Sequence, residues 1–130
     1  MIVDASAVLA VLFNEPDAGR FVAALADHPV RKMSVANYVE AGIRLVHGKA
    51  SAIPRRQLDT FIRAAGIEIE AVSPDQGRLA IDAYRDFGKG SDSPAQLNLG
   101  DCFAYALAKD TGLPLLFKGN DFTHTDIEAA

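Results

Sequence analysis

Short apolar runs alternate with longer amphipathic segments along the whole chain. The runs Met1–Val3, Val30–Met33 and Leu115–Phe117 predict short strands, and Ile67–Val72 alternates apolar and polar residues with the period of two of a half-exposed strand. The segments between them place apolar residues at helical spacing. Strands that alternate with helices favour an α/β fold with one parallel sheet covered on both faces.

Helix start and stop signals divide the intervening segments into six predicted helices. Ser34 is a predicted N-cap, Pro54 stands in a first helical turn, and Gly48 is a predicted helix stop. The tail, residues 122–130, is expected to add one short strand. The six helices are expected over residues 5–13, 16–26, 35–46, 54–65, 73–87 and 100–110.

Composition agrees with a single globular domain over residues 1–130. Hydrophobic residues make up 49% of the chain and charged residues 23%, which argues against disorder. The single cysteine, Cys102, cannot form an internal disulfide. No apolar run approaches the roughly 20 residues that span a membrane, and the N-terminus lacks the basic region of a signal peptide. We therefore expect a cytoplasmic domain without a membrane partner.

Charge is unevenly distributed. Between Ala41 and Gly66 the chain carries five basic residues and one acid, a balance of +4, and because the whole chain carries −4 the remainder carries −8. The acidic total argues against binding nucleic acid by bulk charge alone. The basic segment suits an anionic partner next to a cation site, although a solvated helical surface is the simpler explanation.

Four acids are expected at the carboxyl edge of the predicted sheet, where open α/β sheets bind their ligands. Asp4 ends the first strand, Glu40 and Asp101 lie on helices that begin on that side, and Asp121 follows the last main strand. Each has a structural alternative. Asp4 could be an N-cap, Glu40 an exposed partner of Arg44 one turn away, Asp101 a helix-start acid and Asp121 a turn residue.

Carboxylates that converge in a cleft need a cation. At an effective dielectric near 20, two like charges 4 Å apart repel by about 4 kcal/mol. An all-oxygen set suits Mg²⁺ or Mn²⁺ rather than zinc, and the three histidines stand far apart in the sequence. Phosphodiester hydrolysis follows naturally from such a site. Phosphate-binding glycine loops and the nucleophile elbow are absent from the sequence.

Four blocks of the sequence stand out, and together they span nearly the whole chain. They are residues 1–7, residues 34–40, residues 97–108 (LNLGDCFAYALA), and residues 115–122 (LLFKGNDF) followed by residues 125–127. These blocks resemble the motifs of PIN-domain ribonucleases, and specifically of the VapC-type toxins of bacterial type II toxin–antitoxin modules. The third and fourth blocks are the more specific ones.

The resemblance implies a parallel sheet of about five strands and an acidic cleft that binds Mg²⁺ or Mn²⁺ and activates water. Asp4 and Asp101 are the first choices for direct metal ligands. Glu40 and Asp121 act either directly or through metal-bound waters. Two further residues are expected to support the acids: Ser6 beside Asp4, and Asn120 by orienting Asp121.

The same resemblance implies an RNA substrate, a cognate antitoxin that covers the cleft with a basic side chain, and homodimers that extend to a larger toxin–antitoxin assembly. Candidate substrate-binding residues are the basic side chains Arg44, Arg55, Arg56 and Lys118. The first two helices, rich in Ala, Val, Leu and Phe, are a candidate protein contact, or simply buried core helices. The loop at Ser91–Ser93 lacks the basic residues of related chains, which bears on RNA choice.

Three alternatives stay open from the sequence. The chain could be a PIN nuclease of housekeeping RNA processing or a catalytically inactive metal- and RNA-binding module. It could also be a phosphoryl-accepting receiver domain of similar size. That class needs an aspartate at the end of a central strand, whereas the strands here run into Ser34 and into Ser73–Pro74.

Overall fold

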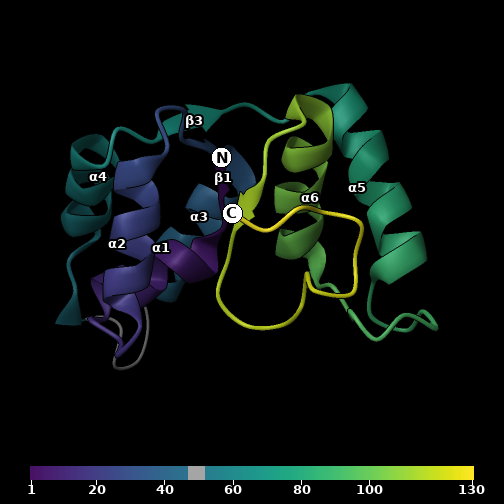
Figure 1. Ribbon diagram of the computed structural model, residues 1–130, viewed down its shortest axis with the longest axis horizontal. Helices are drawn as coiled ribbons and strands as arrows, with labels where there is room; N and C mark the ends of the chain where they lie inside the picture. Colours follow the sequence, from purple (N-terminus) through teal and green to yellow (C-terminus); the bar gives the residue numbers. More distant parts are fainter. Residues whose placement is uncertain (47–51) are drawn as a thin grey trace.

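A four-stranded parallel sheet separates two layers of helices (Figure 1). The structure is a computed structural model, and it describes residues 1–46 and 52–130. Each neighbouring pair of strands is parallel, in the order β3-β2-β1-β4. The strands are β1 (Ile2–Val3), β2 (Lys32–Ser34), β3 (Glu68–Glu70) and β4 (Leu115–Leu116).

All six predicted helices are present, most within one or two residues of the predicted ends. The helix after Ser34 is shorter than predicted, because it ends at Arg44 and is followed by a turn at Leu45 and Val46. The predicted stop at Gly48 lies outside the described residues. The helices are α1 (Ala5–Leu12), α2 (Ala18–Asp27), α3 (Val35–Arg44), α4 (Arg55–Ala64), α5 (Pro74–Phe87) and α6 (Leu99–Thr111).

The tail does not form the short strand that the sequence predicted over residues 122–130. Of the described tail residues, Ala129 alone pairs with the sheet, through an isolated parallel bridge to Leu115 at the edge strand. Turns and bends occupy most of residues 118–126, and these conformations cannot continue a ladder of hydrogen bonds. The expectation of about five strands was therefore too high by one.

Polar side chains start the helices where the strands end. Asp4, Ser34, Ser73 and Asn98 are the N-caps of α1, α3, α5 and α6, and each side chain accepts a hydrogen bond from a main-chain N–H of the first turn. These caps satisfy amide groups that the helix cannot pair internally. Gly112, with φ of 69°, ends α6 in the left-handed conformation that favours glycine.

Alternation along the central strands creates the two helical layers. Successive strand residues point to opposite faces. Val3 and Leu116 pack in one apolar core with α1 to α4, whereas Ile2 and Leu115 pack in a second core with α5, α6 and the tail. Figure 1 shows the two groups of helices on either side of the strands. No helix in the described residues has the length and apolar character that crossing a bilayer requires.

The strand order reverses next to β1, and this reversal fixes where a ligand binds. From β1 the chain moves outward to β2 and β3, then returns to place β4 on the other side of β1. In open α/β sheets the crevice at such a switch point, beyond the carboxyl ends of the strands, is the ligand site. Asp4 follows β1 directly, and the segment that leads to Asp121 follows β4.

Candidate active site

Asp4 lies at the centre of the switch point and is almost completely buried, with 4% of its surface exposed. Its Oδ2 accepts hydrogen bonds from the main-chain N–H of Ser6 at 2.9 Å and from Ser6 Oγ at 2.5 Å. Burial raises the pKa of Asp4, and these bonds from Ser6 partly oppose that shift. Asp4 is therefore both the N-cap of α1 and a buried carboxylate at the sheet edge.

Ser6 connects Asp4 to the segment after β4. Its Oγ accepts a hydrogen bond from the main-chain N–H of Lys118 at 2.9 Å while it donates to Asp4. One hydroxyl thereby ties the end of β1 to the loop that carries Asp121. The sequence placed Ser6 beside Asp4, but it gave no indication of this link across the switch point.

Glu40 reaches the same region from α3 and is half-buried. Its carboxylate lies against Gly100, in the first turn of α6: a β-carbon built on Gly100 would overlap Glu40 Oε2 and lie 2.7 Å from Glu40 Cδ. Burial and the charge of Asp4 raise the pKa of Glu40, while Asn37 and the charge of Arg44 lower it. Glu40 therefore lies against α6, unlike the exposed side chain paired with Arg44 that was its structural alternative.

Asp101 is held by a reciprocal cap at the start of α6. Its Oδ2 accepts the main-chain N–H of Asn98 at 2.9 Å, and its own N–H donates to Asn98 Oδ1 at 2.9 Å. Burial, followed by the charges of Asp4, Asp121 and Glu40, raises the pKa of Asp101 to about 7, against the opposing effect of the Asn98 bond. The helix-start role and a place in the acidic cluster therefore coexist.

Asp121 is the exposed member of the set. It lies in the turns after β4, close enough for its charge to raise the pKa of both Asp4 and Asp101. The preceding Asn120 is also exposed, and its main-chain carbonyl accepts from Thr123 N–H at 3.1 Å. An orienting role for the Asn120 side chain stays a prediction.

Asn37 is the site residue that the sequence did not single out. It is completely buried, and its Nδ2 lies 2.9 Å from the carbonyl of Gly100, 3.4 Å from Asp4 Oδ1 and 3.5 Å from Glu40 Oε2. The available signal was its position three residues before Glu40 on the polar side of the predicted helix. The structural alternative for Glu40 left that side in solvent, whereas α6 covers this part of it.

The four candidate substrate-binding cations differ in their surroundings. Arg44 and Arg56 are exposed. The Arg55 guanidinium lies 3.5 Å from the Asp59 carboxylate and donates to Tyr38 Oη at 3.0 Å. These positions leave the basic segment largely at the surface, within the part of it that the structure describes.

Lys118 is the fourth of these candidates, and acids hold its ammonium group. Lys118 Nζ pairs with Asp17 at 2.9 Å and with Glu15, and hydrogen bonds to both acids raise its pKa. The main chain of Lys118, by contrast, contributes to the site directly through Ser6. Lys118 is thus placed to brace the loop after β4 against the turn between α1 and α2.

The donor set fits a hard divalent cation in an open site. Carboxylate oxygens are the ligands that Mg²⁺ and Mn²⁺ favour. Within residues 1–46 and 52–130, no three His, Cys, Asp or Glu side chains gather closely enough to enclose an ion by themselves. Mg²⁺ commonly takes one or two carboxylates and fills its remaining positions with water and phosphate oxygens, so an open cluster suits it, unlike a closed zinc site.

Comparison with known proteins assigns the family. The chain matches the family model of the PIN domain over residues 1–128. It is 48% identical over 130 residues to the ribonuclease VapC28 of Mycobacterium tuberculosis, which covers 100% of this chain and 97% of that protein. The chain belongs to the VapC ribonucleases of the PIN-domain family. The family resemblance drawn from the four sequence blocks is confirmed.

Solved structures of VapC proteins share the fold. The toxin VapC20 of Mycobacterium tuberculosis, described as cleaving the sarcin–ricin loop, superimposes with a TM-score of 0.77 at 14% identity, covering 99% of this chain and 97% of that one. VapBC2 of Rickettsia felis, bound to a DNA fragment from its promoter, gives 0.71 at 16% identity, covering 99% and 96%. The match to the PIN family model and the named ribonuclease relatives contradict the receiver-domain hypothesis.

Gly100→Ala tests the contact between α3 and α6 in this VapC-family nuclease. The added methyl group occupies the place of the Glu40 carboxylate. We therefore expect RNA cleavage to fall by about 10–100-fold, as for the loss of an outer-shell partner. The unfolding temperature is expected to stay level or rise, because alanine favours helix over glycine by about 0.5–1 kcal/mol.

Gly77→Ala is the matched control, because no described atom lies within 4 Å of a β-carbon added there on α5. Cleavage assays and thermal denaturation on the three proteins separate the two effects. Full activity of the Gly100→Ala protein would show that Glu40 need not lie against α6.

We expect Asp101 to make the stability of the metal-free protein depend on pH. Because the pKa of Asp101 is higher in the folded state than its ordinary value of 3.8, folded protein binds this proton more tightly than unfolded chain does. Stability from this group is complete below about pH 4 and is lost as pH rises toward the folded pKa of about 7.

Asp101→Asn is the comparison, since an amide oxygen can still accept the N–H of Asn98. In EDTA, the unfolding temperature of Asp101→Asn minus that of the wild type is expected to grow between pH 4 and pH 7. A difference that stays constant over this range would mean that the Asp101 carboxyl is solvated like an ordinary aspartate.

Proposed function

We propose that this VapC-family ribonuclease is a toxin whose endonuclease activity depends on Mg²⁺ or Mn²⁺ held by Asp4, Glu40, Asp101 and Asp121. The observation that carries the proposal is the meeting of these acids, from four separate elements, at the switch point of the sheet. Their mutual repulsion is what a cation would relieve. The housekeeping and inactive-module alternatives are less well supported, because the full-length relatives are named VapC ribonucleases.

Each acid has a distinct part in the proposal. Asp4 and Asp101 are the direct ligands, since both are buried and their free oxygens have fixed positions. Glu40 and the exposed Asp121 complete the site from opposite sides, directly or through water. When bound, the cation activates water for attack on the phosphodiester and stabilises the negative charge that develops on phosphate. Ser6 keeps Asp4 and the loop after β4 at a fixed separation.

The RNA substrate approaches along the exposed basic residues next to Glu40. Arg44 lies one turn after Glu40 on α3, and Arg56 is the second residue of α4. Cations at these positions would contact phosphates without reading sequence. Lys118, paired with Glu15 and Asp17, contributes to the site through its position in the loop rather than as a phosphate contact, and Asn120 orients Asp121.

A cognate antitoxin is the partner that the family supports, as the VapBC2 complex illustrates for its own toxin. We propose that a segment of the antitoxin covers the acidic cleft and places a basic side chain among the four acids. That ion pairing would take the place of the cation, and the segment would at the same time block the access of RNA to the cleft. The whole chain, residues 1–130, then acts as one nuclease domain in the cytoplasm.

An apolar face beside the cleft is the proposed homodimer contact. Val35, Val39, Ile43 and Val46 follow one another at helical spacing along α3 and its final turn, and all four are exposed, Ile43 at 60%. Leu99 of α6, 71% exposed, lines the same groove as Val39 and Ile43. Glu40 and Arg44 line it too, so the apolar face borders the acidic site. Exposed apolar patches of this kind commonly mark protein contacts.

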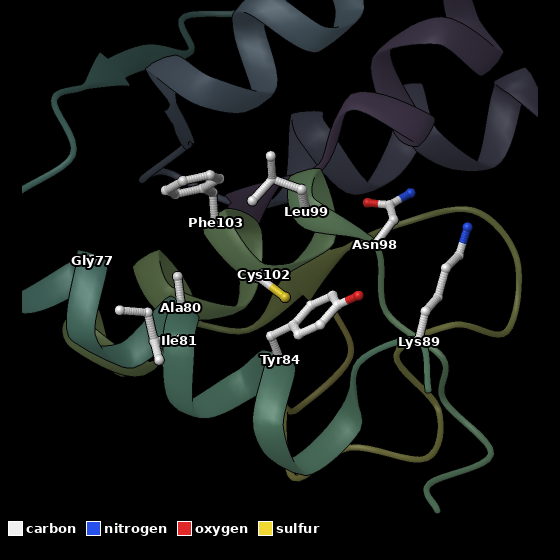
Figure 2. Close-up of a pocket in the computed structure, with 9 residues that line it drawn as sticks. All are labelled: Gly77, Ala80, Ile81, Tyr84, Lys89, Asn98, Leu99, Cys102 and Phe103. Atoms are coloured by element: carbon white, nitrogen blue, oxygen red, sulfur yellow. The ribbon is translucent and has the colours of Figure 1, made fainter. Parts of the chain in front are cut away.

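The face continues over α6 onto α5. A cavity of about 670 Å³ lies there, and Figure 2 shows it with Leu99, Cys102 and Phe103 of α6 opposite Ile81 and Tyr84 of α5. The acids do not line this cavity, so we assign it to association rather than catalysis. A second copy that uses the same face about a twofold axis would bury both apolar surfaces.

Of the first two helices, α1 fits the simpler alternative, that of a buried core helix. Most of the apolar residues of α1 are buried in the core, whereas α2 exposes Val22 at 49%. The exposed apolar face of α3 is therefore the stronger candidate for association between copies.

Cleavage of total RNA by purified, antitoxin-free protein tests the proposed activity. We expect discrete fragments with Mg²⁺ or Mn²⁺, none with EDTA, and recovery when the cation is restored. Asp4→Asn keeps an oxygen that can cap α1 but removes the charge, so cleavage is expected to fall about 10²–10⁴-fold, the range for loss of a group that takes part in the chemistry. Asp27→Asn, at an exposed acid of α2, is the matched control. EDTA-resistant cleavage would overturn the assignment of the cation.

Ile43→Glu tests the homodimer. A charge in the middle of the apolar face is expected to convert a dimer to a monomer in size-exclusion chromatography with light scattering. Val22→Glu places the same charge on α2, away from that face, and is expected to leave the dimer intact. A monomeric wild type, or dissociation by both substitutions, would contradict the proposed contact.

A further inference from the structure

Asn37 occupies an unusual position for a neutral side chain. It is completely buried between α3 and α6, and all three groups around its Nδ2 are acceptors: a carbonyl and two carboxylates. An amide nitrogen carries two hydrogens. The closest contact, 2.9 Å to the Gly100 carbonyl, takes one of them, and the longer contacts to Asp4 and Glu40 share the other.

The other end of the amide has no comparable support. No described residue donates to Asn37 Oδ1, although that atom is buried. Leaving a buried acceptor unsatisfied costs about 1–3 kcal/mol. An apolar side chain of similar size would avoid this cost, so packing alone does not explain an asparagine here. What the amide provides is a hydrogen-bond donor between two carboxylates.

We propose that Asn37 is a positioning residue of the nuclease: its amide nitrogen draws Asp4 and Glu40 together and holds them ready for the cation. The inference rests on the proposed cation-dependent function. Asp4 directly follows β1, Glu40 belongs to α3 and the Gly100 carbonyl belongs to α6, so one side chain sets the relative position of three elements.

The amide also offsets part of the repulsion between the carboxylates before a cation binds. Both carboxylates face a partial positive charge instead of only each other, which offsets some of their repulsion. The contacts of 3.4 and 3.5 Å are long for hydrogen bonds. They leave the carboxylate oxygens able to exchange the amide for a stronger ligand.

Asn37→Asp tests whether position 37 faces the cation, because it keeps the size and replaces the donor with a charged acceptor. In EDTA the variant is expected to unfold at a lower temperature than the wild type, since a third carboxylate then faces Asp4 and Glu40. Addition of Mg²⁺ or Mn²⁺ is expected to raise its unfolding temperature by more than it raises that of the wild type. Because a carboxylate beside the acids strengthens the cation response whatever the native amide does, this result shows that position 37 faces the cation, and the charge-free Asn37→Ala decides between a positioning and a structural role.

Asn37→Ala provides a second variant that adds no charge. It removes the donor, so the Mn²⁺ concentration that half-saturates the thermal shift is expected to rise about 10–100-fold, the usual cost of losing an outer-shell partner of a metal ligand. Asn14→Asp is the matched control for charge, because it makes the same substitution at an exposed asparagine between α1 and α2, outside the acidic cluster. Its cation response is expected to follow that of the wild type.

The outcomes separate the inference from the function on which it rests. A cation-dependent shift in the wild type, with an enlarged shift in Asn37→Asp and weaker binding in Asn37→Ala, supports the positioning role. The same shift and the same half-saturating concentration in all proteins overturn that role and leave the cation-dependent function standing. No shift in the wild type with either ion overturns both.

Discussion

Repulsion among buried carboxylates is the constraint around which this protein is built. Asp4 and Asp101 are both removed from water and lie near two further acids, and burial alone already disfavours their charged forms. The fold tolerates this because each buried oxygen has a donor close by. Ser6 supplies donors to Asp4, and the main chain of Asn98 supplies one to Asp101.

The topology explains why such an arrangement can be held rigidly. Each acid comes from a different element, and the elements converge only because β4 returns to the side of β1 opposite β2. Two apolar cores, one on each face of the sheet, fix the helices that carry Glu40 and Asp101. Activity therefore depends on packing far from the acids as well as on the acids themselves, as is typical of sites assembled at a switch point.

Much of this fold could be predicted from the sequence, because its local signals agree with one another. Alternation of short apolar runs with helical patterns indicated the α/β class, and residues such as Ser34 marked where helices begin. The short strand predicted for the tail was wrong, because turns and bends occupy residues 118–126 and, of the described tail residues, only Ala129 bridges to the sheet. Asp4 and Asp101 could be proposed from their positions, because strand ends and first helical turns place polar groups at a known edge.

What could not be predicted depends on contacts between elements. The burial of Asn37 follows from the packing of α6 over one side of α3, and a helical pattern shows only which residues share a side, not which neighbour covers it. The pairing of Lys118 with Glu15 and Asp17 joins residues about a hundred positions apart, so no local pattern indicates it. The close approach of Glu40 to Gly100 has the same origin.

That close approach has a genetic consequence. At most surface positions of α6 several amino acids would serve, but at position 100 every replacement of glycine adds a β-carbon where the Glu40 carboxylate lies. Replacement by a small residue such as alanine or serine is therefore expected to disarm the nuclease while leaving a folded chain. Bacteria forced to express the protein without an antitoxin are expected to yield survivors with mutations at codon 100, alongside those at the codons of the four acids.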